Sequence, residues 1–330
     1  MRPYACPRCP QMVFFDDLSC EACGIELAFS PSSETMIALE EAHACDHRAE
    51  IGCSWAVEDE ASPSCRSCRT TVARPPAEDA GATAAWAEAE AAKRQLFAQA
   101  ISLGFDVEGA RFALKSGAYE PVTTGHADGL VTIDVRESDD VVRTRMRARM
   151  GEAYRTMLGH FRHEIGHYVW MVEVDGTDRL ESCRARFGDD RQSYADALEA
   201  HYAGSPPADW ADHFVSEYAS AHPWEDFAET FAHYLHIRDT LETAETFGVT
   251  VSGDHPVLEA DPNLDDAANM RAIIERWLPL TYALNALNRS MGARPLYPFV
   301  LSEEVIAKLG WIHRLLTGRA VPKGDANAAA

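Results

Sequence analysis

A glutamate flanked by two histidines constrains this chain more than any other feature of its sequence. The stretch reads His163-Glu164-Ile165-Gly166-His167, and apolar residues around it recur at helical spacing. Because residues four apart share one face of a helix, His163 and His167 can both reach one metal ion. Glu164 then lies beside that ion, where a carboxylate can take a proton from water. The pattern predicts a helix that carries half of a metal site.

A second helix is expected downstream, where Trp224 and the residues after it follow the helical period behind Pro223. It carries Glu225 and Glu229, and either could supply the anionic third ligand while the other lies outside it. Two histidines and one glutamate with an open fourth position form a catalytic rather than a structural zinc set. Gly166 weakens the first helix by about 1 kcal/mol relative to alanine. A close approach of the second helix would explain this glycine.

The chemistry of such a site assigns further roles. Zinc lowers the pKa of its water from near 16 to about 7, so Glu164 is the expected general base. The oxyanion that develops needs another donor, for which Tyr218 is the first candidate and His222 the second. Glu229 could accept the second ring N–H of a ligand histidine. The competing interpretation is a buried helix with two satisfied histidines and surface glutamates.

Eight of the nine cysteines lie before residue 70. Cys6-x-x-Cys9 and Cys20-x-x-Cys23 form two CxxC turns, each of which points two thiolates at one ion, so that the pair completes a tetrahedron. This spacing predicts a structural zinc ribbon. A disulfide framework would fit a secreted protein, but no signal peptide precedes these residues.

A second zinc site of the same kind is predicted from the remaining early cysteines, which are less regularly spaced. One CxxC pair is complete, and the other two cysteines lie further apart, so that a nearby histidine could replace one of them. Free cysteines around a single CxxC turn are the alternative. The four cysteines are Cys45, Cys53, Cys65 and Cys68, and the histidines are His43 and His47.

Charge excludes some partners. The chain has 52 acidic and 30 basic residues, a net charge of −22, which disfavours nucleic acids and anionic membranes. Residues 1–72 hold twelve acidic residues and five arginines, the wrong sign for phosphate contacts. A protein partner of this module is one expectation, and a small fold that simply needs metal is the other. No apolar run approaches the roughly 20 residues of a membrane span, and no export signal is visible, so we expect a cytoplasmic protein.

The expected fold class is α+β. A mostly helical domain with a small sheet follows a cysteine-rich zinc-ribbon module. The strand-like runs and the periodic segments support this division, and a proline- and alanine-rich stretch reads as a linker. Expected strands are 112–115 and 130–135, and the main expected helices are 86–103, 224–240, 264–290 and 303–317. The predicted parts are a two-site module at 1–72, a linker at 73–83, a domain at 84–317 and a disordered tail at 318–330.

The two helices with their glutamates resemble the gluzincin branch of the zincin metallopeptidases, and the later one is similar to the corresponding helix of anthrax lethal factor. This resemblance implies that Glu225 is the third zinc ligand, with Glu229 supporting it, and that Tyr218 occupies the place of an active-site tyrosine. Most of residues 1–320 resembles a bacterial family of zinc-binding metallopeptidases with an N-terminal zinc ribbon. The stretches that carry it are the double cysteine module, GHADGLVTIDV, YRTMLGHFRHEIGHYVW and HPWEDFAETFAHYLH.

The resemblance implies a zinc metallopeptidase of the HExxH type that acts on a peptide or protein substrate. About three zinc ions per chain are expected, one catalytic and two structural. Two rival functions use the same residues. One is a zinc-dependent amidase or deacylase acting on a substrate that is not a peptide, and the other is a zinc-ribbon adaptor with an idle zincin domain.

Overall fold

The computed structural model describes residues 2–59, 61–76, 78–79, 81–139, 142–144, 156–204, 206–252 and 267–318. The predicted tail therefore lies outside the described residues, apart from Gly318. The described part is mostly helical with small sheets, which confirms the α+β prediction. The chain forms two compact units, Met1–Ile165 and Gly166–Ala330. Among the described helices, none combines the length and the apolar character needed to cross a membrane.

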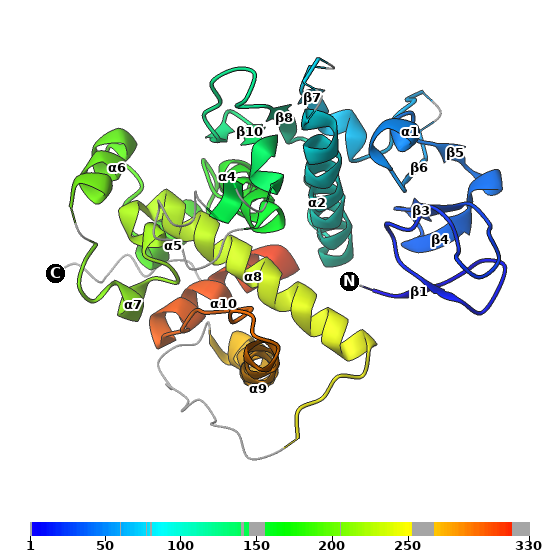
Figure 1. The fold of residues 1–330 in the computed structure, drawn as a ribbon. Coiled ribbons are helices and arrows are strands. Elements are labelled where there is room, and N and C mark those ends of the chain that lie inside the picture. Colours follow the sequence, from blue (N-terminus) through cyan, green and yellow to red (C-terminus); the bar gives the residue numbers. More distant parts are fainter. Residues whose placement is uncertain are drawn as a thin grey trace. The chain divides into compact units, whose positions relative to one another are not determined.

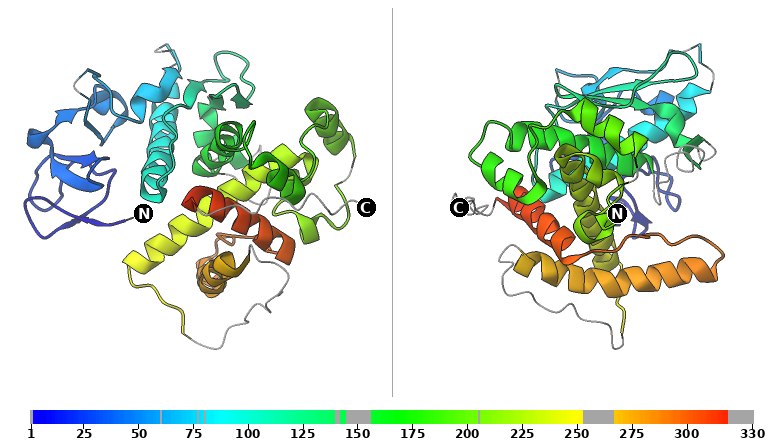
Figure 2. Two further views of the ribbon diagram at one scale, coloured as in Figure 1. Left: turned by 180° about the vertical axis from the view of Figure 1, so that it is seen from behind. Right: turned by 90° about the vertical axis from the view of Figure 1, so that its left-hand side faces the viewer.

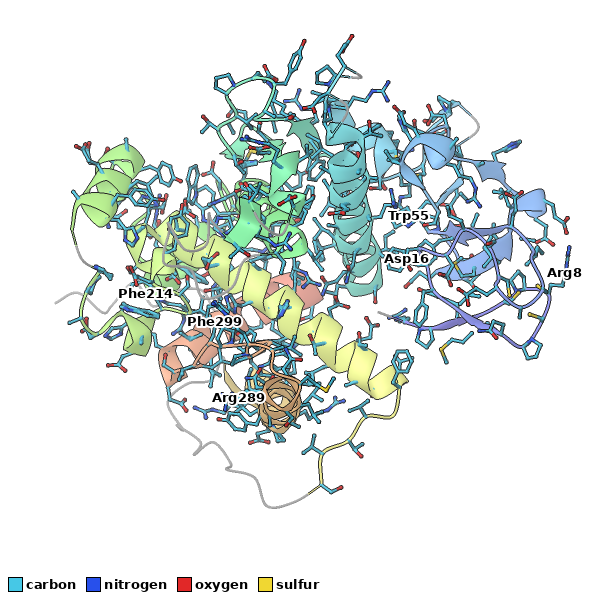
Figure 3. The ribbon with its side chains drawn as sticks, viewed as in Figure 1. Arg8, Asp16, Trp55, Phe214, Arg289 and Phe299 are labelled. Atoms are coloured by element: carbon cyan, nitrogen blue, oxygen red, sulfur yellow. The ribbon has the colours of Figure 1, made fainter. Side chains whose placement is uncertain are left out.

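The first unit begins with three small antiparallel strand pairs. β1 (Tyr4–Ala5) pairs with β2 (Met12–Val13), β3 (Leu27–Ser30) with β4 (Thr35–Ala38), and β5 (His43–Ala44) with β6 (Ala56–Val57). Among the short helical turns, η1 (Leu39–Glu41) precedes β5, α1 (Arg48–Ile51) connects β5 to β6, and η2 (Cys68–Thr70) follows β6. The ring of Trp55 is buried against that of Phe29, with centroids 5.3 Å apart (Figure 3). Strand pairs this short have little core of their own, which is why small modules of this kind depend on metal.

A four-stranded sheet follows in the order β7-β8-β10-β9. β7 (Thr71–Ala73) and β10 (Leu130–Asp134) both run parallel to β8 (Arg111–Lys115), and β9 (Gly125–Ala127) is antiparallel to β10. β7 comes directly after the last cysteine of the module, so that the module contributes one strand to this sheet. The predicted division at residues 73–83 stays a prediction.

The helix α2 (Ala82–Leu103) lies next to these strands in sequence and in space (Figure 1). It ends at Gly104, whose φ of +75° favours glycine. Phe97 of α2 packs on Phe112 of β8, and Phe112 packs on Phe161, with centroid distances of 6.0 and 5.8 Å. β10 runs on into the short helix η3 (Val135–Ser138).

The helix α4 (Met157–Glu173) is continuous through the boundary between the two units. The second unit then contains α5 (Leu180–Phe187), α6 (Tyr194–Ala203), α7 (Trp210–His213), η4 (Tyr218–Ala221), α8 (Pro223–Thr246), α9 (Ala267–Ser290) and α10 (Glu303–Thr317). α8 is the central element, in contact with η4, α5, α9 and α10. The right-hand view of Figure 2 shows α9 along its length, with α10 beside it.

The core around α8 is aromatic and contains a buried ion pair. The rings of Phe187, Phe227 and Trp311 lie 5.4 to 5.9 Å from one another. The buried Asp226 carboxylate lies 2.7 Å from the Lys308 ammonium group. The pair joins α8 to α10, and loss of either partner would leave an unpaired buried charge, which is strongly destabilising. The Lys308 ammonium group also lies 4.3 Å from the ring centre of Phe214 (Figure 3).

Candidate metal centres and active site

α4 and α8 come close to each other at Gly166. A Cβ atom on this residue would lie 3.0 Å from the Cα atom of Ala228 and 3.3 Å from its carbonyl oxygen. Such distances are tighter than most Cβ contacts, so a side chain here would require the neighbouring helix to shift by a few tenths of an ångström, which agrees with the expected reason for the glycine. This contact brings the next residue, His167, against the first turn of α8, where its Nε2 lies 3.5 Å from Oε2 of Glu225.

Three potential ligands gather at this place. One ligand atom from each of His163, His167 and Glu225 lies within 4.8 Å of the other two. Ligand atoms about 2.0–2.2 Å from a tetrahedral zinc are roughly 3.3–3.5 Å apart, so the spacing of His167 and Glu225 fits that metal. Glu225 is almost fully buried, with 1% of its surface exposed. A buried carboxylate needs a positive partner, and a metal ion would supply one.

Glu164 is also buried, on α4 between the two histidines. Its Oε1 lies 3.2 Å from Nε2 of His160, which is one helical turn earlier. On the other side, Nδ1 of His160 lies 2.9 Å from Oε2 of Glu137, in η3. Neither His160 nor Glu137 was among the residues that the sequence singled out. The spacing of four between His160 and Glu164 was a signal for His160, and no sequence pattern pointed to Glu137.

Tyrosines surround the other side of Glu225. The hydroxyl of Tyr194, in α6, donates a hydrogen bond of 2.5 Å to Glu225 Oε1. Burial raises the pKa of the Tyr218 hydroxyl, and the charge of Glu225 raises it further, so this phenol stays protonated at neutral pH. Tyr194 was missed by sequence reasoning because it lies on an exposed helix, 31 residues before its partner. No pattern in the sequence connects the two positions.

The other two predicted residues have structural partners. His222 caps α8, with its Nδ1 accepting from the backbone N–H of Trp224 at 3.1 Å and its Nε2 3.4 Å from the carbonyl oxygen of Gln192. To donate to an oxyanion it would have to release Gln192. Glu229 Oε2 accepts a 2.6 Å hydrogen bond from the hydroxyl of Ser216, just before η4. Glu229 therefore contacts the segment that carries Tyr218.

The first cysteine cluster has the spacing of a zinc site. Its Sγ atoms lie 3.7 Å apart for Cys6 and Cys23 and 3.6 Å apart for Cys9 and Cys20. Thiolates at about 2.3 Å from a tetrahedral zinc are roughly 3.8 Å apart, whereas a disulfide bond is about 2.05 Å long. All four cysteines are free. The cluster therefore fits a zinc ribbon and not a disulfide framework.

The second cluster is formed by the four cysteines that were predicted, all of them buried. Cys53 Sγ lies 3.7 Å from the sulfur atoms of both Cys65 and Cys68. The backbone N–H of Cys65 points at Cys45 Sγ, 3.4 Å away, which is the kind of donor that a thiolate needs. The metal-ligand group found among the described residues here contains neither His43 nor His47.

Comparison with known proteins assigns this architecture to a class of zinc-binding proteins. Residues 82–315 match the model of a family described as "Putative zinc-binding metallo-peptidase". Residues 3–79 match the model of a zinc-ribbon domain. The first match covers more than half of the chain, and the chain belongs to this metallopeptidase family. This confirms the resemblance that the sequence motifs indicated.

Full-length relatives occur in mycobacteria. Uncharacterized protein Rv2568c of Mycobacterium tuberculosis is 41% identical over 332 residues, which cover 96% of this chain and 95% of the relative. Uncharacterized protein Mb2598c of Mycobacterium bovis matches to the same extent. These matches extend through both the ribbon region and the helical region. No solved structure matches the chain.

Proposed function

We propose that this protein is a zinc-dependent peptidase that hydrolyses peptide bonds, with Glu164 as general base. His163, His167 and Glu225 are the residues that would hold the catalytic zinc. Zinc bound there supplies a water of lowered pKa, near 7, and polarises the carbonyl group of a substrate. The observation that carries the proposal is the convergence of three ligand atoms within 4.8 Å beside a buried, non-ligand carboxylate.

The residues around the proposed metal have separate catalytic and positioning roles. Glu164 takes a proton from the attacking water and returns it to the leaving amine, so that no net proton is lost. We assign Tyr218 as the donor to the oxygen that becomes negative, since its hydroxyl is protonated at neutral pH and burial raises its pKa further. Tyr194 holds Glu225 through Oε1, which leaves Oε2 toward His167. A ligand held in this way costs less to orient when metal binds.

The test is cleavage of a peptide library by the full-length, zinc-loaded chain, read by mass spectrometry. Glu164→Gln keeps the shape and the ligand set, so we expect it to bind zinc as the wild type does. It should lose activity by about 100-fold or more, because the general base is gone. If this variant loses zinc as completely as His163→Ala does, Glu164 acts as a ligand and the scheme is wrong.

The same variant can be used to identify the substrate by capture. An inactive enzyme that still binds retains its substrate, so Glu164→Gln should enrich peptides or proteins that the wild type releases as products. Cleavage of N-acylated small molecules without cleavage of any peptide would replace the peptidase by an amidase or deacylase. Failure of the zinc-loaded wild type to cleave either class would favour the adaptor function of the zinc-ribbon module.

A further inference from the structure

His160 bridges two buried carboxylates at the edge of the proposed site. Its Nδ1 lies 2.9 Å from Glu137 Oε2, and its Nε2 lies 3.2 Å from Glu164 Oε1. The exposed fraction of the side chain is 11% for His160, 2% for Glu137 and 6% for Glu164. All three residues belong to the first compact unit, so this geometry is internal to one body.

The two contacts favour a ring that is protonated on both nitrogen atoms. An ionised carboxylate can only accept hydrogen bonds, so a ring between two ionised carboxylates donates from both nitrogen atoms, as an imidazolium does. Burial alone lowers the pKa of the His160 imidazole, but the charges and hydrogen bonds of Glu137 and Glu164 raise it overall, to about 9. A buried cation of this kind is tolerated because both of its donors are paired.

Glu137 is held in place from several directions. Asp134 caps η3, its Oδ1 accepting from the backbone N–H of Arg136 at 3.1 Å. The hydroxyl of Thr124 lies 3.4 Å from Glu137 Oε1. The guanidinium of Arg143 donates to the carbonyl oxygen of Glu137 at 2.9 Å. The backbone of Glu137 is therefore held by contacts around the turn that contains it, and its carboxylate also lies near the Thr124 hydroxyl.

We propose that His160, oriented by Glu137, is a positioning residue for Glu164. It holds one carboxylate oxygen of Glu164 in a fixed direction in a buried site. The contact does not prevent Glu164 from acting as a base, because each carboxylate can accept several hydrogen bonds. The inference rests on the proposed function, in which Glu164 is the general base.

The alternative is a purely structural role, in which the bridge only ties η3 to α4. Three variants of the full-length chain separate the two. His160→Phe fills the space but has no donor, whereas His160→Gln keeps one donor and is the conservative rescue. His213→Gln is the matched control, because His213 also pairs with a glutamate, at 2.5 Å from Glu304 Oε2, but is exposed and contacts none of the proposed site residues.

Kinetics on a cleaved peptide give the first readout. We expect His160→Phe to keep the zinc content of the wild type and to lower kcat by about 10- to 100-fold, with little change in KM. His160→Gln should recover most of this loss, and His213→Gln should match the wild type. Wild-type kcat in His160→Phe would overturn the proposal. Loss of one zinc ion in that variant would also overturn it, because His160 would then support metal binding instead of Glu164.

Two further readouts need no substrate. In the ¹⁵N-histidine-labelled chain at pH 7, both ring nitrogens of His160 should carry protons, and their signals should be missing from His160→Gln. Acetohydroxamic acid, a small zinc ligand whose hydroxyl group can donate to Glu164, should bind the zinc-loaded wild type. Glu164→Gln and His160→Phe should weaken that binding by a similar factor, about tenfold, whereas His213→Gln should not.

These readouts distinguish the two proposals. If the wild type cleaves no peptide but the nuclear magnetic resonance and hydroxamate results are as expected, the peptidase function fails and the positioning role stands. If Glu164→Gln weakens hydroxamate binding and His160→Phe does not, the positioning role fails alone. Should His160→Phe not fold, Glu137→Gln carries the test, since it removes the anchoring charge with little change of shape. Unchanged kcat and hydroxamate affinity in that variant would overturn the proposal.

Discussion

Gly166 of α4 lies against the backbone of Ala228 in α8, so close that a Cβ atom would be 3.0 Å from the Ala228 Cα atom. One residue further along α4, His167 faces Glu225 at 3.5 Å, although the two are 58 positions apart in the chain. The contact of the two helices thus sets the width of the proposed metal site.

Replacement of this glycine should therefore damage stability and metal binding together. Gly166→Ala gains about 1 kcal/mol of helix propensity. It also requires α8 to shift by a few tenths of an ångström, for which we expect an overpacking cost of about 1–3 kcal/mol. We expect lower thermal stability, measured by calorimetry, and weaker binding of the catalytic zinc ion, measured by zinc titration. A variant that is more stable than the wild type and binds zinc equally well would show that the two helices can separate freely here.

The two glutamates of α8 should differ in what their loss does. Glu225→Ala should remove the catalytic zinc and lower the total by one ion per chain. Glu229→Ala should keep that ion but bind it about 10- to 100-fold more weakly, because Glu229 acts on the neighbouring turn through Ser216. The measurement is a zinc titration of both variants. The reverse result would exchange the two assignments, and retention of zinc in both would place the third ligand elsewhere.

The tyrosines that contact Glu225 should also behave differently. Tyr194→Phe removes the hydroxyl that holds Glu225 Oε1, so the catalytic zinc should bind about 10-fold more weakly or worse. Tyr218→Phe should keep zinc and lower kcat by about 100- to 1000-fold, as expected for an oxyanion donor. Tyr202→Phe, on the same exposed helix as Tyr194, is the control. If Tyr218→Phe retains full kcat, the oxyanion donor is another group.

The number of zinc ions per chain should show whether each cysteine cluster binds zinc, independently of the active site. The purified chain should carry about three zinc ions, and Cys65→Ser should remove one of them. Cys183→Ser is the matched control, since Cys183 is buried but belongs to none of the metal-ligand groups found among the described residues. Elemental analysis that finds a single zinc ion in the wild type would contradict both the second ribbon site and the catalytic site.

Local sequence patterns predicted many of the secondary-structure elements and the pairing of nearby ligand residues. A spacing of four on a helix places His163 and His167 on one face whatever the rest of the chain does, and a CxxC turn pairs two thiols by its own geometry. The helices predicted at 224–240, 264–290 and 303–317 are found at Pro223–Thr246, Ala267–Ser290 and Glu303–Thr317. The predicted strands at 112–115 and 130–135 lie within one residue of β8 and β10. Periodicity predicts such elements well because it reflects burial on one side.

Tertiary structure alone decided which distant groups meet. The register of α8 against α4 turns Glu225 toward His167 and places Glu229 beside Ser216. The sequence spacing alone could not decide which of the two glutamates faces the histidine. Tyr194 reaches Glu225 from an exposed helix, and Glu137 reaches His160 from the end of a strand, without any sequence pattern that links them. A hydrogen bond between elements depends on how whole surfaces pack, which involves many residues at once. Helix and turn geometry, by contrast, is fixed within a few bonds along the chain, and that part the sequence determined by itself.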